Sequence, residues 1–83
     1  MKYFVGRKSK ITGQVDYQYA KCRDLYCSEK YIRTYPKRVW QFSKQGAKGI
    51  VDRENGIASM HGWNYEYFMI PVTDILPESE VRE

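Results

Sequence analysis

The clearest periodic pattern in the sequence is a short amphipathic helix in the middle of the chain. Four side chains recur at spacings of three and four residues and would share one helix face: Ala47, Ile50, Val51 and Glu54. Ser43 is a favourable N-cap, and Phe42 before it can pack against the first turn. Asn55 and Gly56 are typical of a left-handed helix stop. The pattern predicts a helix over residues 43–55.

Three other stretches alternate between apolar and polar side chains and are rich in β-branched and aromatic residues, which is typical of strands. They cover residues 2–8, 14–22 and 63–72. The last stretch carries large side chains on both faces, with Tyr67 on one side and Phe68 on the other. We therefore expect residues 63–72 to form the central strand of a sheet.

Residues 24–34 fit two different structures. Asp24 could cap a short helix that carries Ile32 along one side. Residues 30–35 could instead form a strand, and their β-branched and aromatic content favours the strand for the second half of the segment. In either case Pro36 ends the regular structure, because its ring removes a backbone donor and restricts the residue before it.

These elements predict an α+β fold, in which an antiparallel sheet of three or four strands has one main helix, about 43–55, packed on one face. At 83 residues the chain is long enough for one core only. We expect a single domain over residues 1–76, and we expect the acidic residues 77–83 to form a frayed tail.

Composition limits the class of protein. Hydrophobic residues make up 42% and charged residues 29% of the chain, as in an ordinary globular domain. No apolar run reaches the roughly 20 residues that span a bilayer, and the first residues do not form a signal peptide. We expect a soluble cytoplasmic protein that does not bind membranes, with Cys22 and Cys27 as free thiols.

Few residues in the chain are suited to catalysis or metal binding. His61 is the one histidine, and no spacing selects a carboxylate or a nucleophile to work with it. Cys22, Cys27 and His61 would supply at most three metal ligands, whereas a closed zinc site uses four. We expect neither an enzyme nor a bound cofactor or metal.

Two glycines lie inside the predicted helix at Gly46 and Gly49, on either side of Lys48. This spacing lacks the pattern of a phosphate-binding loop. Glycine destabilises a helix interior by about 1 kcal/mol relative to alanine, so we interpret both residues as positions where the helix backbone packs closely on the sheet. On this interpretation, a bulky residue at position 49 would unfold the protein.

The most suggestive functional feature is the basic and aromatic segment before the helix. Residues 1–48 hold twelve Lys and Arg against three acidic residues, a net charge of +9, whereas residues 49–83 carry −5. Tyrosine rings alternate with these cations, and the candidate binding residues are Arg23, Lys30, Tyr31, Arg33, Tyr35, Lys37 and Arg38. Tyrosine and arginine are frequent anchors in protein interfaces, so the segment predicts an acidic protein partner. Single-stranded nucleic acid is the alternative ligand, because rings stack on bases and cations contact phosphates.

The central part of the chain resembles a class of small phage-encoded α+β proteins of unknown function. The resemblance covers about a third of the chain and rests on residues 42–51, Phe-Ser-Lys-Gln-Gly-Ala-Lys-Gly-Ile-Val, and on the Tyr-rich residues 65–72 that end at Pro-Val. It implies an α+β fold, a phage source and action in the host cytoplasm. It also implies an inhibitor or modulator that docks on a host protein, and it assigns no site residue.

Overall fold

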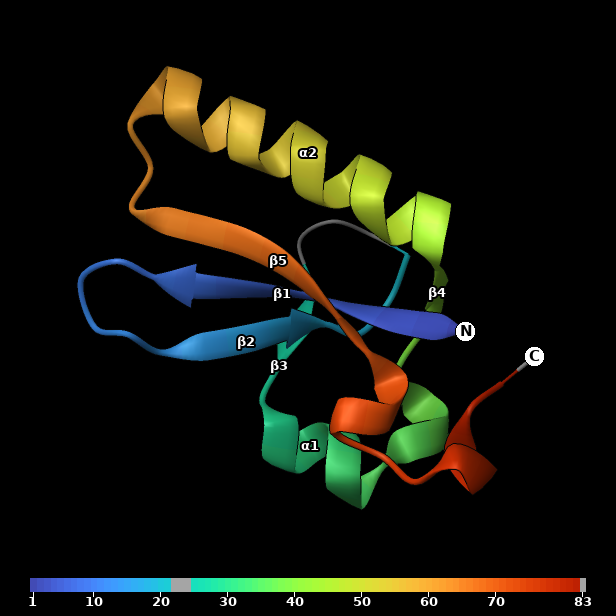
Figure 1. The fold of residues 1–83 in the computed structure, drawn as a ribbon. Helices are drawn as coiled ribbons and strands as arrows, with labels where there is room; N and C mark the ends of the chain where they lie inside the picture. The colour runs from blue at the N-terminus through green and yellow to red at the C-terminus, as the bar shows by residue number, and fades with distance from the viewer. Residues whose placement is uncertain (22–24, 83) are drawn as a thin grey trace.

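In the part of the chain that the structure describes, five strands form one antiparallel sheet around its first strand. The computed structural model describes residues 1–21 and 25–82. Along the chain the strands are β1 (Lys2–Ser9), β2 (Val15–Gln18), β3 (Tyr26–Cys27), β4 (Phe42–Ser43) and β5 (Tyr65–Pro71). The helices are α1 (Glu29–Thr34) and α2 (Lys44–His61), with short 3₁₀ turns η1 (Pro36–Arg38), η2 (Val72–Asp74) and η3 (Glu78–Glu80). The predicted α+β class is confirmed (Figure 1).

The central strand is β1 and not the predicted 63–72 stretch. On one edge β1 pairs with β2 and, closer to its start, with β4, while β5 pairs along its other edge from Tyr3 to Ser9. The strand β3 extends the sheet beyond β2. Gly6 of β1 lies under Phe68 of β5, and a Cβ atom at Gly6 would approach the Phe68 ring to 2.5 Å. This glycine therefore allows the Phe68 ring to pack across β1 at the centre of the sheet.

The helix α2 covers one face of the sheet, as the sequence predicts. Its N-cap is confirmed, because the Ser43 hydroxyl accepts a hydrogen bond of 3.1 Å from the Gly46 amide. Phe42 and Ala47 pack in one buried cluster with Val5 of β1. Figure 1 shows α2 above β5, with its first turn following directly from β4.

The predicted end of this helix is wrong. Asn55 and Gly56 lie inside α2, which continues to His61 and ends where Gly62 adopts a left-handed backbone with φ of 66°. Asn55 does not act as a stop because its side chain bonds to β5. Its amide nitrogen donates to the Tyr67 carbonyl at 3.0 Å, and its amide oxygen accepts from the Tyr67 amide at 2.8 Å.

The two helix glycines are not packing positions. Gly49 is exposed, and a Cβ atom there would meet nothing within 4 Å. A Cβ atom at Gly46 would meet only the Ser43 hydroxyl, at 3.1 Å. Both residues point away from the sheet, because the buried face of α2 is formed by Ala47, Glu54 and Ala58. The interpretation of Gly49 as a contact with the sheet is therefore wrong.

Residues 29–34 form a helix, so the favoured strand is wrong. The Ser28 hydroxyl caps α1 by accepting a hydrogen bond of 3.1 Å from the Tyr31 amide. Glu29 and Arg33, one helical turn apart, form an ion pair of 3.0 Å. The alternative cap, Asp24, lies outside the described residues. Pro36 ends α1 as expected and begins η1.

The other face of the sheet is covered by α1 and the three 3₁₀ turns. Figure 1 shows these elements gathered below the sheet, on the side opposite α2. The larger of the two cores lies here and includes Phe4, Tyr17, Ile32, Val39, Val72, Ile75 and Leu76. Within residues 77–82, Val81 also packs against this core. The expected frayed tail over residues 77–83 stays a prediction.

Candidate binding surface

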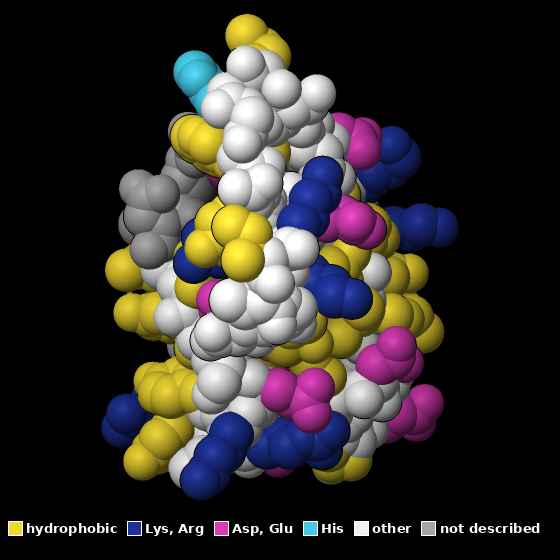
Figure 2. All heavy atoms as spheres, turned by 90° about the vertical axis from the view of Figure 1, so that its left-hand side faces the viewer, with side chains coloured by type: hydrophobic (Ala, Val, Ile, Leu, Met, Phe, Trp, Pro, Cys, Tyr) yellow, Lys and Arg dark blue, Asp and Glu magenta, His cyan; other side chains and the backbone are white. Residues whose placement is uncertain are grey.

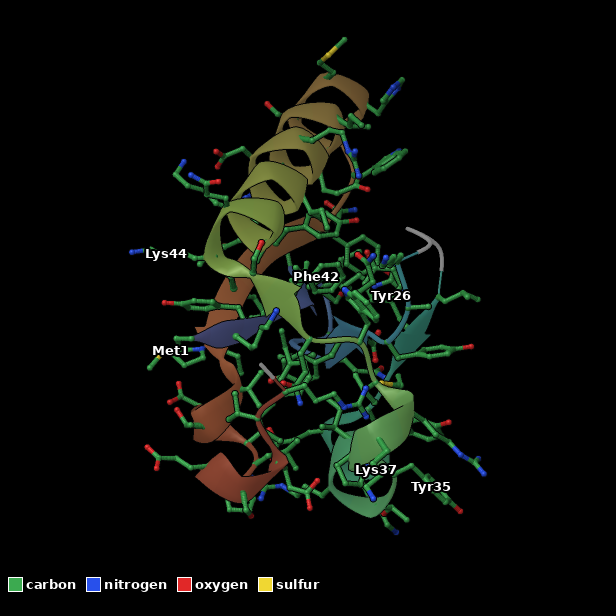
Figure 3. All side chains as sticks on the ribbon, turned by 90° about the vertical axis from the view of Figure 1, so that its right-hand side faces the viewer. Met1, Tyr26, Tyr35, Lys37, Phe42 and Lys44 are labelled. Carbon is green, nitrogen blue, oxygen red and sulfur yellow. The ribbon has the colours of Figure 1, made fainter. Side chains whose placement is uncertain are left out.

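Six of the seven candidate binding residues lie on one continuous segment. Lys30, Tyr31 and Arg33 are in α1, Tyr35 is its C-cap, and Lys37 and Arg38 are in η1. Arg23 lies outside the described residues. Of the six described residues, all except Tyr31 are exposed. Figure 3 shows the labelled Tyr35 and Lys37 projecting from this segment, far from Lys44 at the start of α2.

The tyrosines of this segment form a row of packed rings. The centroid of the Tyr31 ring lies 6.0 Å from that of Tyr19 and 5.1 Å from that of Tyr35. The guanidinium carbon of Arg38 lies 4.6 Å from the centroid of the Tyr35 ring. Tyr19 and Tyr31 pack against the larger core, whereas Tyr35 is 43% exposed. The row therefore leads from the core to the surface and fixes the position of its outermost ring.

A second ring–cation pair lies beside the first. The Lys21 ammonium is 4.3 Å from the centroid of the Trp40 ring, which is 40% exposed. The Trp40 amide donates a hydrogen bond of 2.8 Å to the carbonyl of Tyr19. Tyr19 therefore connects the row of tyrosine rings with the Lys21–Trp40 pair. We call Tyr19, Lys21, Lys30, Tyr31, Tyr35, Lys37, Arg38 and Trp40 the tyrosine surface. Tyr19, Lys21 and Trp40 were absent from the predicted set. Trp40 follows η1 by two residues, whereas Tyr19 and Lys21 come to Tyr31 and Trp40 only through folding.

The cations of the tyrosine surface and the neighbouring Arg33 differ in whether they already have an ionic partner. Both Nε and Nη2 of Arg33 donate to one carboxylate oxygen of Glu29, so its charge is locally neutralised. In the described part of the chain, neither Lys30 nor Lys37 is within ion-pair distance of an acidic group. The free positive charge of the surface is therefore carried by its lysines and by Arg38.

Two of the side chains considered for catalysis are in the described residues and belong to different elements, His61 to α2 and Cys27 to β3. His61 stands at the outer end of α2, stacked on Trp63 with a ring-centroid distance of 5.4 Å, and it is exposed as the cyan side chain in Figure 2. Cys27 is a free thiol, and burial, with a smaller effect from Asp16, raises its pKa to about 11. It is therefore protonated at neutral pH. Cys22 lies outside the described residues.

Metal ligands do not come together either. Within residues 1–21 and 25–82, no group of three or more His, Cys, Asp or Glu side chains could hold a metal ion. Across the same residues, no helix combines the length and the apolar character needed to cross a membrane.

A polar cluster lies between α2 and the sheet. The guanidinium carbon of Arg7 is 3.9 Å from the centroid of the Tyr26 ring and 4.6 Å from that of Tyr65. Asp16 is 3.7 Å from Arg7 Nε, and Glu54 of α2 is only 2% exposed. Burial raises the pKa of Tyr26 to about 12. The two rings already cover the Arg7 guanidinium, so we interpret this cluster as a structural contact that holds β3 against the rest of the sheet.

Comparison with known proteins finds no matching family model, no similar curated protein and no similar solved structure.

Proposed function

We propose that this protein is a small non-catalytic binding module that docks an acidic segment of another protein on its tyrosine surface and thereby modulates that protein. The observation that carries the proposal is the row of packed rings from Tyr19 to Tyr35, with Arg38 over its outermost ring. A ring that is fixed before binding loses little conformational entropy when a partner covers it. This arrangement suits an interface anchor.

The charges around the row support an acidic partner. Lys30 and Lys37 are exposed beside the rings, and Arg38 lies over Tyr35. Exposed cations of this kind raise the association rate with an acidic partner and help to set its orientation. Salt should weaken the interaction, because screening at about 0.15 M reduces the reach of such charges to roughly 8 Å.

The same geometry makes single-stranded nucleic acid the weaker candidate. Stacking of a base requires an open ring face. The Tyr35 ring is already contacted by Tyr31 and Arg38, and the Trp40 ring by Lys21. A base would have to displace one of these neighbours, whereas a carboxylate can approach the cations and leave the rings in place.

A charge-reversal experiment tests the proposal. Polyglutamate and oligothymidylate serve as probes, at about 50 mM salt where charge contacts are strongest, and binding is followed by NMR shifts of backbone amides. Lys37→Glu should weaken polyglutamate binding roughly three- to tenfold. The matched control is Lys44→Glu, an exposed lysine on another part of the molecule that should leave binding within about twofold.

The shifts should map to residues 29–40, and Tyr35→Ala should also weaken binding. An equal loss in Lys37→Glu and Lys44→Glu would mean that only net charge matters, and the proposed surface would be wrong. If oligothymidylate binds more tightly than polyglutamate and this binding depends on Tyr35, the ligand is nucleic acid and not an acidic protein segment.

A further inference from the structure

Residues 77–82 are held against the fold by one buried glutamine. Gln41 lies between η1 and β4 and is 4% exposed. Its amide nitrogen donates to the Glu80 carbonyl at 2.8 Å, and its amide oxygen accepts from the Arg82 amide at 2.8 Å. A side-chain amide that bonds to backbone groups two residues apart imitates a neighbouring strand. The two bonded groups flank Val81, whose backbone is extended, whereas Glu80 is the last residue of the 3₁₀ turn η3. The contact therefore recognises one extended residue after a turn, whatever its side chain is.

Besides this backbone contact, two side chains of residues 77–82 also contact the fold. Val81 packs against the larger core. Arg82 donates from Nη2 to the Pro36 carbonyl at 3.0 Å. An open hollow of about 370 Å³ is lined by Met1 and Thr73 of the fold and by Glu78 and Val81 of the segment itself. The pattern is an aliphatic residue followed by arginine, and the hollow leaves room for an aliphatic side chain larger than valine.

Few contacts hold the segment in place. Its internal structure is the single turn η3, closed by hydrogen bonds from Glu80 to Pro77 and from Val81 to Glu78. In the described residues it joins no strand of the sheet. Segments with few buried contacts open locally at a small fraction of the cost of global unfolding. Opening would leave the buried Gln41 amide without its partners, which is unfavourable until another backbone replaces them.

From these contacts we infer that Gln41, the Pro36 carbonyl and the part of the hollow lined by Met1 and Thr73 form a second binding site, the Gln41 site. Its ligand is a peptide segment of a partner protein in which an extended aliphatic residue is followed by arginine. Residues 77–82 occupy the site in this structure and must be displaced by that peptide. This inference does not depend on the tyrosine surface, because the Gln41 site recognises a backbone and an apolar side chain and not an acidic cluster.

The test uses the full chain with its own segment weakened. Val81→Asp removes the aliphatic contact, and the probe is a synthetic peptide with the sequence of residues 77–83. The Val81→Asp chain should bind this peptide, with NMR shifts at the Gln41 side-chain amide. The unmodified chain should bind it at least about tenfold more weakly, because its own segment competes. A peptide with leucine in place of the valine should bind at least as tightly.

Two matched controls test whether binding depends on the Gln41 side-chain amide and on the aliphatic residue of the peptide. Val81→Asp combined with Gln41→Met keeps a similar side-chain length without hydrogen bonds, and it should lose peptide binding. A peptide with aspartate in place of the valine should not bind. Failure of a folded Val81→Asp chain to bind the native-sequence peptide would overturn the inference. So would a concentration-dependent dimer that exchanges residues 77–82, because the partner would then be a second copy of the chain.

If Val81→Asp does not fold, hydrogen exchange of the unmodified chain tests whether residues 77–82 open locally. The Arg82 amide, bonded to Gln41, should exchange far faster than the Phe4 amide in the centre of β1, because residues 77–82 open locally. Equal protection of the two amides would show that the segment leaves its site only on global unfolding, and the inference would be wrong.

Discussion

Asn55→Ala separates two roles that this residue could have. Its sequence context, followed by glycine, indicates a helix stop. In the structure its side chain forms two hydrogen bonds to the backbone of Tyr67, of 2.8 and 3.0 Å. Tyr67 faces Arg7 across the β1–β5 pair, and its backbone groups point to the open edge of β5. Asn55 therefore supplies the partner that an edge strand lacks.

The size of the effect follows from these contacts. Each hydrogen bond contributes about 1 kcal/mol net, and more when the remaining groups are left buried without a partner. Tyr67 is only 6% exposed, so water replaces the lost partner poorly. Alanine recovers roughly 0.6 kcal/mol through its higher helix propensity. We expect Asn55→Ala to lower the free energy of unfolding by about 1–3 kcal/mol.

Urea unfolding followed by tryptophan fluorescence measures this change. The matched control is Gly56→Ala, one residue further along α2, where a Cβ atom meets nothing within 4 Å. It should raise stability by about 0.5–1 kcal/mol through helix propensity alone. Hydrogen exchange of the Tyr67 amide should also accelerate in Asn55→Ala. An Asn55→Ala variant as stable as the parent, with unchanged exchange at Tyr67, would refute the role of the amide at the sheet edge.

Two further predictions concern the helix and the polar cluster. Gly49→Ala should raise the free energy of unfolding by about 0.5–1 kcal/mol, because the site is exposed and unobstructed; destabilisation in thermal melts would restore the packing interpretation. The pKa of Tyr26 is raised from 10.0 to about 12, so between these values the unfolded chain ionises while the folded chain keeps the proton. Stability should therefore fall as pH rises through this window, and Tyr26→Phe should make the fall shallower; an unchanged slope would show that Tyr26 is not responsible.

Local signals in the sequence were enough for the elements whose stabilising contacts lie within a few residues. The N-cap at Ser43 needs only the amide of Gly46, three residues along the chain. The alternation of β1 and β5 follows from the two faces of a strand. The end of α1 before Pro36 is a property of the proline ring. These features and the α+β class were predictable because no distant partner is needed to produce them.

The candidate surface was predictable only in part. Its six described residues from Lys30 to Arg38 are close in sequence, and a helix keeps them together. Tyr19, Lys21 and Trp40 join them through a backbone hydrogen bond and ring packing between distant segments. Nothing in the order of residues indicated this contact.

What the sequence alone determined is the set of local elements and the concentration of positive charge before α2. Tertiary structure decided which strand is central, where α2 ends and what holds residues 77–82. In the last two cases a side-chain amide bonds to a distant backbone, from Asn55 to Tyr67 and from Gln41 to residues 80 and 82. In a sequence pattern, asparagine and glutamine usually indicate loops or exposed positions. Their role here depends on a partner that only the folded chain brings within 3.0 Å.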